Sequence, residues 1–314
     1  MADLLALGAS VLELAPPKHE RLETTERFAV GVTGPESNAT IAASRLGADA
    51  AWVSKLPENP LGRRVTGDLR RHGVETAVRW TDSGRQGLAF TERAGEPRGG
   101  MTCHDREAAV ASMTPEEVPS STTDDASTVL TSGATATLSE TLTRTTRTVF
   151  EECGASGVTT VCSLSRPRVV ESASAREALS PLLATTDVLL TTETGAAAFV
   201  DRATPTGTAH ALAAGHGFET VVLVRADRGA VVWHDNRVDD HDAPATDATD
   251  DRGAFDALCG GFLARRLAGE SPNRALAAGV ACGAIARTIE GAVPAIDPAT
   301  VERCVDSMSG STVE

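Results

Sequence analysis

The chain of 314 residues is 41% hydrophobic and 23% charged, and global disorder is excluded because this composition supplies enough apolar side chain for a folded core. Its 43 acidic and 29 basic residues give a formal net charge of −14, which disfavours nucleic acid and anionic membranes as partners. No apolar run reaches the ~18–20 residues that span a bilayer and no secretory signal is recognisable, so we expect a cytoplasmic protein.

The first predicted elements alternate between strand and helix. A short apolar run at 4–8 and an alternating run at 28–34 predict strands, and helical spacing of apolar residues predicts a helix over 39–46, preceded by Pro-Glu-Ser-Asn at 35–38. A strand at 51–54 and a helix at 60–72 follow. This order is typical of a parallel sheet that is covered by helices.

The alternation breaks after the second helix. Extended runs at 76–80, 87–91 and 100–103 are separated by Gly-, Pro- and Asp-containing turn signals. Antiparallel strands inserted in this way indicate a small sheet that stands off the main one. We therefore predict a lid over a ligand site, contributed by about residues 10–34 and 74–104.

Beyond residue 128 the alternation returns. Strands are predicted at 129–130, 158–163, 188–190, 220–224 and 230–233. Helices are predicted at 138–151, 195–200, 209–214, 257–267 and 273–289. The Ser/Thr-rich stretch 119–127 is the linker candidate by composition. The whole pattern predicts an α/β fold with a central, mostly parallel sheet and helices on both faces.

The cysteines form no recognisable metal or disulfide pattern. No C-x-x-C pair is present, and no histidine lies at metal-ligand spacing. We expect buried, unpaired thiols and no zinc site at the six positions, which are Cys103, Cys153, Cys162, Cys259, Cys282 and Cys304.

The strongest chemical signal is the heptad Asp-Asp-Arg-Gly-Ala-Phe-Asp at 250–256, directly before a predicted helix. The N–H groups and the positive dipole end of a helix start attract anions, and Asp256 lies in the first turn, beside that anion site. A phosphoryl-transfer enzyme needs both parts, because one stabilises phosphate charge and the other accepts the proton of the attacking hydroxyl. The carboxylate of Asp256 could also serve only as a partner of the helix dipole.

This heptad, together with Gly-Gly-Phe-Leu at 260–263, resembles the C-terminal signature D-x-x-G-A-G-D of the PfkB, or ribokinase-like, family of carbohydrate kinases. The segment from Gly31 to Asn38 resembles the family's N-terminal glycine/asparagine signature, as do the residues that follow it, which are Ala42, Leu46 and Gly47. The resemblance runs essentially end to end. It implies one ribokinase-like kinase domain over residues 1–314, with a β lid, ATP and Mg²⁺ as cofactors, and assembly into a homo-oligomer.

Within the family the chain is most similar to 2-keto-3-deoxygluconate kinases. The similarity lies in four short segments, at 85–90, 96–98, 104–106 and 165–168. Two of them contain Arg106 and Arg166, whose guanidinium forks suit the carboxylate of a sugar acid. Both side chains could instead be ordinary surface arginines.

The resemblance also implies individual roles. Asp256 would act as the general base on the sugar's primary hydroxyl, while backbone amides from Gly253 through Ala254 and Phe255 hold the transferring phosphate. Substrate binding is implied for Gly34, Asn38, His104, Arg106 and Arg166. Nucleotide binding is implied for Arg225, Asp227, Gly229 and Gly253. No metal ligand in the protein is predicted, and Asn38 could also be only a helix cap.

Several positions depart from the family pattern. Phe255 stands where the signature has a glycine, so we expect its Cβ and ring to occupy a tight turn beside the phosphate. Little is left of the nucleotide-side motifs at 191–193 and 224–229, where only Gly229 of two loop glycines is kept. The other departures are Ala9 for an acidic residue, Ala89 and His104 for tyrosines, and Cys162 and Leu164 for polar residues.

Three hypotheses about function follow. The first is ATP-dependent phosphorylation of 2-keto-3-deoxygluconate to its 6-phosphate, with Asp256 as the base. The second is a catalytically impaired, kinase-like protein that binds a sugar acid or regulates a partner. The third is a kinase of the same family that acts on a fructose phosphate, ribose or a nucleoside.

The basic and aromatic residues are unusual in kind. Lys18 and Lys55 are the two lysines among 29 basic residues, and tyrosine is absent. Together with the acidic surplus, this composition predicts a protein from a salt-accumulating halophile, in which concentrated salt screens the self-repulsion of a large charge. A mesophile with a GC-rich genome is the alternative and explains the arginine bias but not the charge.

Overall fold

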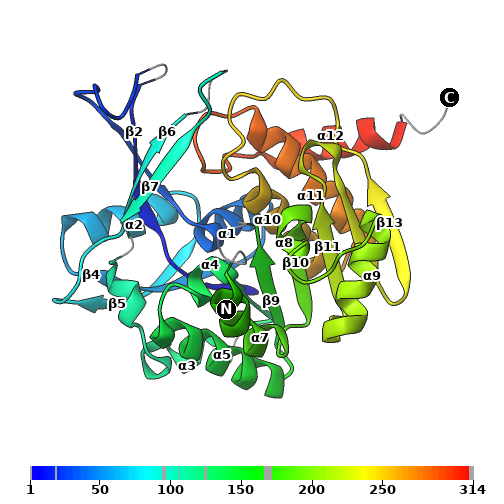
Figure 1. Cartoon of the computed structure of the whole chain (residues 1–314), viewed down its shortest axis with the longest axis horizontal. Helices are drawn as coiled ribbons and strands as arrows, with labels where there is room; N and C mark the ends of the chain where they lie inside the picture. The colour runs from blue at the N-terminus through cyan, green and yellow to red at the C-terminus, as the bar shows by residue number, and fades with distance from the viewer. Residues whose placement is uncertain are drawn as a thin grey trace.

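Two β-sheets organise the chain (Figure 1). The computed structural model describes residues 2–17, 20–93, 97–105, 107–123, 126–165 and 172–310. Strands of the larger sheet are, from edge to edge, β13 (Arg237–His241), β12 (Ala230–His234), β11 (Thr220–Val224), β10 (Val188–Thr192), β9 (Thr159–Leu164), β8 (Thr128–Ser132), β1 (Leu4–Leu7), β4 (Ala50–Pro57) and β5 (Glu75–Thr81). Neighbours from β11 to β5 are parallel, whereas β12 and β13 pair antiparallel. The predicted, mostly parallel sheet is confirmed.

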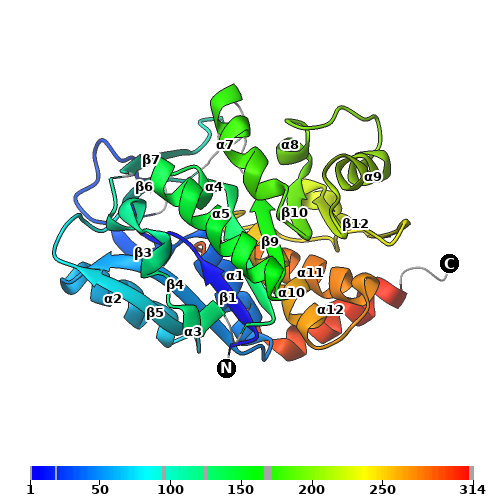
Figure 2. The same cartoon turned by 90° about the horizontal axis from the view of Figure 1, so that it is seen from below.

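Helices cover both faces of this sheet (Figure 2). One face carries α5 (Glu140–Ala155), α7 (Ala173–Leu183) and α9 (Pro205–His216). The other carries α1 (Pro35–Arg45), α2 (Pro60–Arg70), α10 (Ala254–Leu267) and α11 (Pro272–Arg287), and α12 (Pro298–Gly310) packs outside α11. Short helical turns complete the described chain: η1 (Ala109–Ser112), η2 (Pro115–Glu117), α3 (Ser120–Thr123), α4 (Gly133–Ala136), α8 (Glu193–Ala196) and η3 (Ala226–Arg228).

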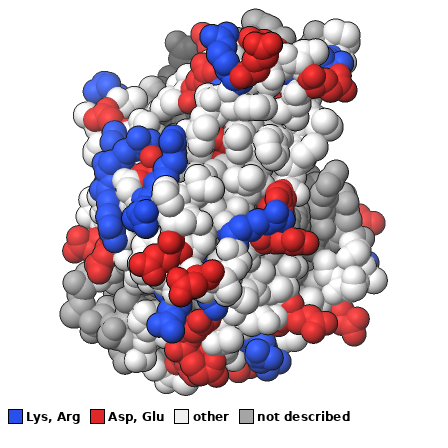
Figure 3. All heavy atoms as spheres, turned by 90° about the vertical axis from the view of Figure 1, so that its left-hand side faces the viewer, with Lys and Arg blue, Asp and Glu red and all other residues white. Residues whose placement is uncertain are grey.

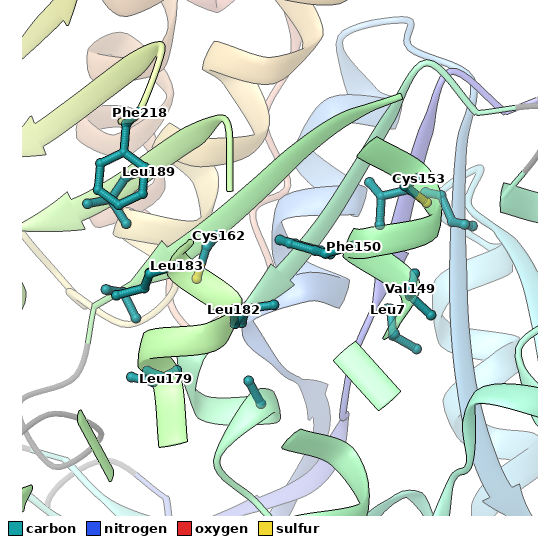
Figure 4. Packing of buried hydrophobic residues seen from close by; sticks show 14 of the residues in the cluster. Leu7, Val149, Phe150, Cys153, Cys162, Leu179, Leu182, Leu183, Leu189 and Phe218 are labelled. Atoms are coloured by element: carbon teal, nitrogen blue, oxygen red, sulfur yellow. The ribbon is translucent and has the colours of Figure 1, made fainter. Parts of the chain in front are cut away.

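Strand β1 shows why two cores form. Its four residues are all buried apolar side chains that alternate in direction, so Leu5 and Leu7 join one hydrophobic cluster while Leu4 and Ala6 join the other. Figure 4 shows the first cluster, in which Phe150 of α5 is one of the large buried side chains. Burial on both faces explains why a central strand is a continuous apolar run.

A separate four-stranded sheet is built from segments in which we predicted a lid, and we use the word lid below as the name of this sheet. Its order is β3 (Ala29–Thr33), β2 (Val11–Ala15), β6 (Leu88–Glu92) and β7 (Met101–Asp105). The lid prediction for 74–104 is wrong in its first part, because β5 lies beside β4 in the larger sheet. Helix α2 supplies the crossover that this parallel pair requires.

Other expectations need smaller corrections. The prediction that all six cysteines are buried is wrong for Cys103, which is exposed on β7, and for Cys304, which is half-buried. Strand β13 and helices α7 and α12 were not predicted. No helix in the part of the chain that the structure describes is long and apolar enough to cross a membrane.

The surface does not display the net charge evenly. Figure 3 shows the face that bears the lid and α2, where basic side chains form a cluster among acidic ones. Helix α2 contributes four exposed arginines to the surface, which are Arg63, Arg64, Arg70 and the adjacent Arg71. The acidic surplus therefore does not cover the whole molecule.

Candidate active site

A cavity of about 610 Å³ lies between the lid and the start of α10. Its walls come from the segment after β1, the start of α1, the inner side of β6 and β7, and the turn before α10. Ligands of open α/β sheets bind at the carboxyl ends of the parallel strands, and the segment after β1 leaves such an end. Three predicted substrate residues, Gly34, Asn38 and His104, line this cavity.

Asn38 and Asp256 meet at the floor of the cavity. The amide Nδ2 of Asn38 donates to Asp256 Oδ2 at 2.9 Å and to Thr33 Oγ1 at 3.1 Å. Asn38 is only 2% exposed, and the helix cap is Gly34, so the interpretation of Asn38 as a mere cap is wrong. Helices α1 and α10 approach closely here because Gly260 has no Cβ, which would lie 2.2 Å from the Ala39 carbonyl oxygen.

The turn before α10 requires a glycine at 253. Gly253 caps the helix with φ +74°, and a Cβ there would lie 2.0 Å from the Ala292 carbonyl oxygen. The first N–H groups of a helix lack carbonyl partners within the helix and therefore suit an anion, although in α10 the N–H of Ala254 donates to the Asp251 carbonyl oxygen before the helix, at 3.4 Å. Asp256 lies in the same first turn, so a proton acceptor and an anion site are adjacent.

Phe255 does not obstruct this turn. In the heptad only Gly253 has a positive φ among the described residues, so the helical backbone at 255 accepts a side chain. The ring packs against a hydrophobic core cluster, and the residue lines both the first cavity and a second one. The expectation of a ring in a tight turn is therefore wrong, because the tight turn is two residues earlier.

Arg252 holds two carboxylates together. Its Nη1 lies 2.6 Å from Glu13 Oε1 on β2, and its Nη2 lies 2.5 Å from Asp250 Oδ2. Burial opposes the charge of Arg252, but hydrogen bonds with Asp250 and the nearby carboxylate of Glu13 outweigh it and raise the pKa of the guanidinium. The sequence reasoning missed Arg252 and Glu13, although a cation inside an acidic heptad was a usable signal.

The second cavity, of about 440 Å³, lies on the other side of the same turn. Asp227 and Gly229 line it, as the nucleotide prediction expects. Gly229 has φ +100°, and a Cβ there would lie 2.0 Å from the His241 carbonyl oxygen. The side chain of Arg225 turns to Asp242 Oδ1, at 3.1 Å, and is not part of the described cavity wall.

A buried carboxyl, that of Glu36, follows the cavity-lining residue Pro35. Glu36 is 0% exposed, and its Oε1 accepts hydrogen bonds from the backbone N–H and the hydroxyl of Ser132 at 2.8 and 2.5 Å. Burial raises the pKa of Glu36 against the lowering effect of these bonds. A Cβ on Gly8 would lie 2.2 Å from this carboxyl carbon, which explains the glycine at the end of β1.

Cys162, which replaces a polar residue of the family pattern, lies close to this carboxyl. Burial and then the charge of Glu36 raise the pKa of its thiol to about 12, so the thiol stays protonated and chemically inert. The two predicted carboxylate-binding arginines, Arg106 and Arg166, lie outside the described residues. Nor does the described part of the chain contain a group of three or more His, Cys, Asp or Glu residues that could hold a metal ion.

Comparison with known proteins shows which family the whole chain resembles. A family model described as pfkB family carbohydrate kinase matches residues 1–298. A 2-dehydro-3-deoxygalactonokinase of Haloferax volcanii is 41% identical over 306 residues, which cover 96% of either chain.

Solved structures share the fold. A 2-dehydro-3-deoxygluconokinase from Thermotoga maritima superposes with a TM-score of 0.90 at 24% identity, over 98% of this chain and all of that one. An E. coli protein in complex with ATP and Mg²⁺ gives a TM-score of 0.89 at 18% identity, with the same coverage. At these identities the two structures support the architecture rather than the substrate.

Proposed function

Since the chain belongs to the pfkB family of carbohydrate kinases, we propose that it transfers a phosphoryl group from ATP to the primary hydroxyl of a 2-keto-3-deoxy sugar acid. The best candidate is 2-keto-3-deoxygluconate, with the 6-phosphate as product. The galactonate epimer is the alternative, because the relative at 41% identity bears that name. The observation that carries this proposal is the contact of Asn38 with Asp256 beside the anion-binding start of α10.

Asp256 would remove the proton from the attacking hydroxyl. The hydrogen bond from Asn38 fixes the direction of its carboxylate, and the first-turn position places it next to the N–H groups that would hold the transferred phosphate. Gly253 keeps these N–H groups accessible, because its positive φ begins the helix without a side chain. Proton acceptor and phosphate site then act within one helical turn.

The second cavity fits the nucleotide. Its walls are largely apolar, formed by side chains such as Val224, Leu258 and Val280, which suit a planar base. A Cβ on Gly229 would collide with the backbone of residues 241–243, so this position of the cavity wall requires a glycine. Mg²⁺, bound with ATP, would neutralise phosphate charge during transfer.

The substitution Asp256→Asn tests the proposal. We expect the turnover number to fall by about 10²–10⁴-fold, because the amide cannot accept the proton. ADP release should be measured with both 2-keto-3-deoxy epimers in molar KCl, and the position of the phosphate determined by NMR. Asp68→Asn is the matched control and should leave turnover unchanged, because the Asp68 carboxylate on α2 pairs with Arg71 and lines neither cavity.

Three outcomes would contradict the proposal or a part of it. A wild-type rate in the Asp256→Asn protein would exclude this residue as the base. A wild-type protein that binds the sugar acid in calorimetry but releases no ADP would favour the binding hypothesis. If the protein phosphorylated only fructose phosphates, ribose or nucleosides, its substrate class would differ from the proposed 2-keto-3-deoxy sugar acids.

A further inference from the structure

The first cavity, which we call the sugar cavity, has more acidic than basic side chains in its described wall. Among the described residues that line it, Glu13, Asp105, Asp251 and Asp256 are acidic, and Arg252 is the one arginine or lysine. Asp105 and Asp251 already pair with Arg85 and Arg287, at 2.5 and 2.7 Å, so Glu13 is the lining carboxylate that Arg252 pairs with. The proposed substrate and ATP are both anions, and like charges brought together in a partly buried site repel each other. A cation placed against Glu13 therefore lowers the repulsion that an anionic ligand meets.

Contacts with Asp250 hold the guanidinium of Arg252 in a fixed position beside the cavity. Its guanidinium is 23% exposed and makes a fork with Asp250, with Nε 2.9 Å from Oδ1 and Nη2 2.5 Å from Oδ2. Asp250 is held in turn by the backbone N–H of Gly291 at 3.0 Å. A guanidinium fixed on both sides keeps its position whether or not the cavity is filled.

Glu13 is the carboxylate that Arg252 neutralises inside the cavity. Its side chain is 12% exposed, lies on lid strand β2 and is 2.6 Å from Arg252 Nη1. Without the arginine, a nearly buried negative charge would face the sugar. Such a charge opposes the entry of an anion far more than that of a neutral sugar.

We propose that Arg252 is a specificity-determining residue, whose charge, shared between Asp250 and Glu13, offsets the negative charge of the cavity wall and so favours the binding of a sugar acid relative to that of a neutral sugar. The inference rests on the proposed function for the identity of the acid. A purely structural role is the alternative, in which Arg252 only ties β2 to the turn before α10. That role would affect acidic and neutral ligands alike.

Calorimetry separates the two roles. The ligands are 2-keto-3-deoxygluconate and 3-deoxyfructose, which has a hydroxymethyl group in place of the carboxylate. We expect Arg252→Gln to weaken binding of the acid by about tenfold or more and binding of the neutral sugar by about threefold or less. Arg252→Lys should restore part of the affinity for the acid. In the double variant Glu13→Gln/Arg252→Gln, the acid should bind more tightly than in Arg252→Gln alone.

The control is Arg93→Gln. Arg93 lines a neighbouring cavity between the lid and residues 248–252 and pairs with Glu290, so its loss changes the net charge equally but leaves the sugar cavity intact. Equal weakening of both ligands by Arg252→Gln would overturn the inference, as would unchanged binding of the acid or a wild-type protein that binds neither sugar. Wild-type turnover tests the proposed function separately, because a protein that binds the acid without phosphorylating it refutes the kinase activity alone.

Discussion

The two cavities that meet at the start of α10 are built in different ways. On the side of the first cavity, the proposed sugar side, polar and charged side chains contact one another. Asn38 donates a hydrogen bond to Asp256, and Arg252 forms an ion pair with Glu13. On the nucleotide side, the walls are mostly small or apolar, and Arg225, which the sequence predicted to bind nucleotide, pairs with Asp242 instead. The sugar side depends on the identity of its side chains, whereas the nucleotide side depends on backbone shape.

This difference explains which motif residues can vary. The nucleotide loop at 224–229 has lost one of its two family glycines, yet the cavity persists because Gly229 still provides the close backbone approach. On the sugar side, Asn38 and Asp256 are both kept, because only an aspartate at 256 combines the contact with Asn38 and a carboxylate that can accept a proton. Departures from the pattern also occur on this side, at Ala9, Ala89 and His104, so the two sides differ in which residues are kept.

After Asp256→Asn, the largest effect is expected from Gly253→Ala, which changes the turn between the two cavities. A Cβ would collide with the Ala292 carbonyl and move the start of α10 together with Asp256. We predict that kcat/KM falls by about 10²–10³-fold, as on loss of a preorganised phosphate site. Steady-state ADP release and thermal unfolding measure the two consequences.

The control for this variant is Gly47→Ala. Gly47 has φ +93° but no atom within 4 Å of its virtual Cβ, so it shares the backbone strain without the collision. We expect a stability loss of about 1 kcal/mol and normal turnover. If the two alanine variants are equally active, the shape of the turn at 253 is not essential to catalysis.

A smaller effect is expected from Phe255→Gly, which restores the family residue. The ring is part of the nucleotide wall and packs against the core, so its loss should raise the KM for ATP by about fivefold and lower stability by about 2 kcal/mol. The turnover number should stay within about threefold of wild type, as Phe255→Leu should also show. A gain of more than about tenfold in kcat would instead mean that the ring obstructs phosphoryl transfer.

Most of the fold was predictable because its signals are local. The apolar runs of the buried parallel strands and the spacing in α1 and α10 gave the right element types. β13 was missed because Arg-Val-Asp-Asp-His is an edge strand with little apolar content. β5 was assigned to the wrong sheet because a local pattern does not say which neighbour a strand pairs with.

The site was predictable only where a residue belongs to a motif. Asp256, Gly253 and Asn38 were found in this way, and the structure brings all three to one cavity. Glu36 meets Ser132 across 96 positions of sequence, and Arg252 meets Glu13 across most of the chain, so no spacing rule reveals either contact. The misjudgement of Phe255 has a similar cause, since backbone angles decide which residue of a turn must be glycine.

The smallest effect is expected at Ala226, the other family glycine position of the nucleotide loop. Ala226 has φ +53°, so the backbone keeps the left-handed conformation although the glycine is gone. A left-handed residue with a Cβ is strained by about 1–2 kcal/mol, while glycine adds about 0.4–1 kcal/mol of unfolded-state entropy. Ala226→Gly should therefore stabilise the protein by about 0.5–1 kcal/mol in urea unfolding, with turnover within about twofold of wild type.

Ala243→Gly is the matched control, because Ala243 lines the same cavity but has no positive φ. There the substitution relieves no strain and should destabilise the protein by about 0.5–1 kcal/mol. Equal changes of stability at the two positions would show that the loop is not strained. The backbone at 226 is left-handed with either residue, so Ala226→Gly changes the side chain and leaves the backbone shape. A marked rise of kcat in this variant would therefore show that the nucleotide side, like the sugar side, depends on the identity of its side chains.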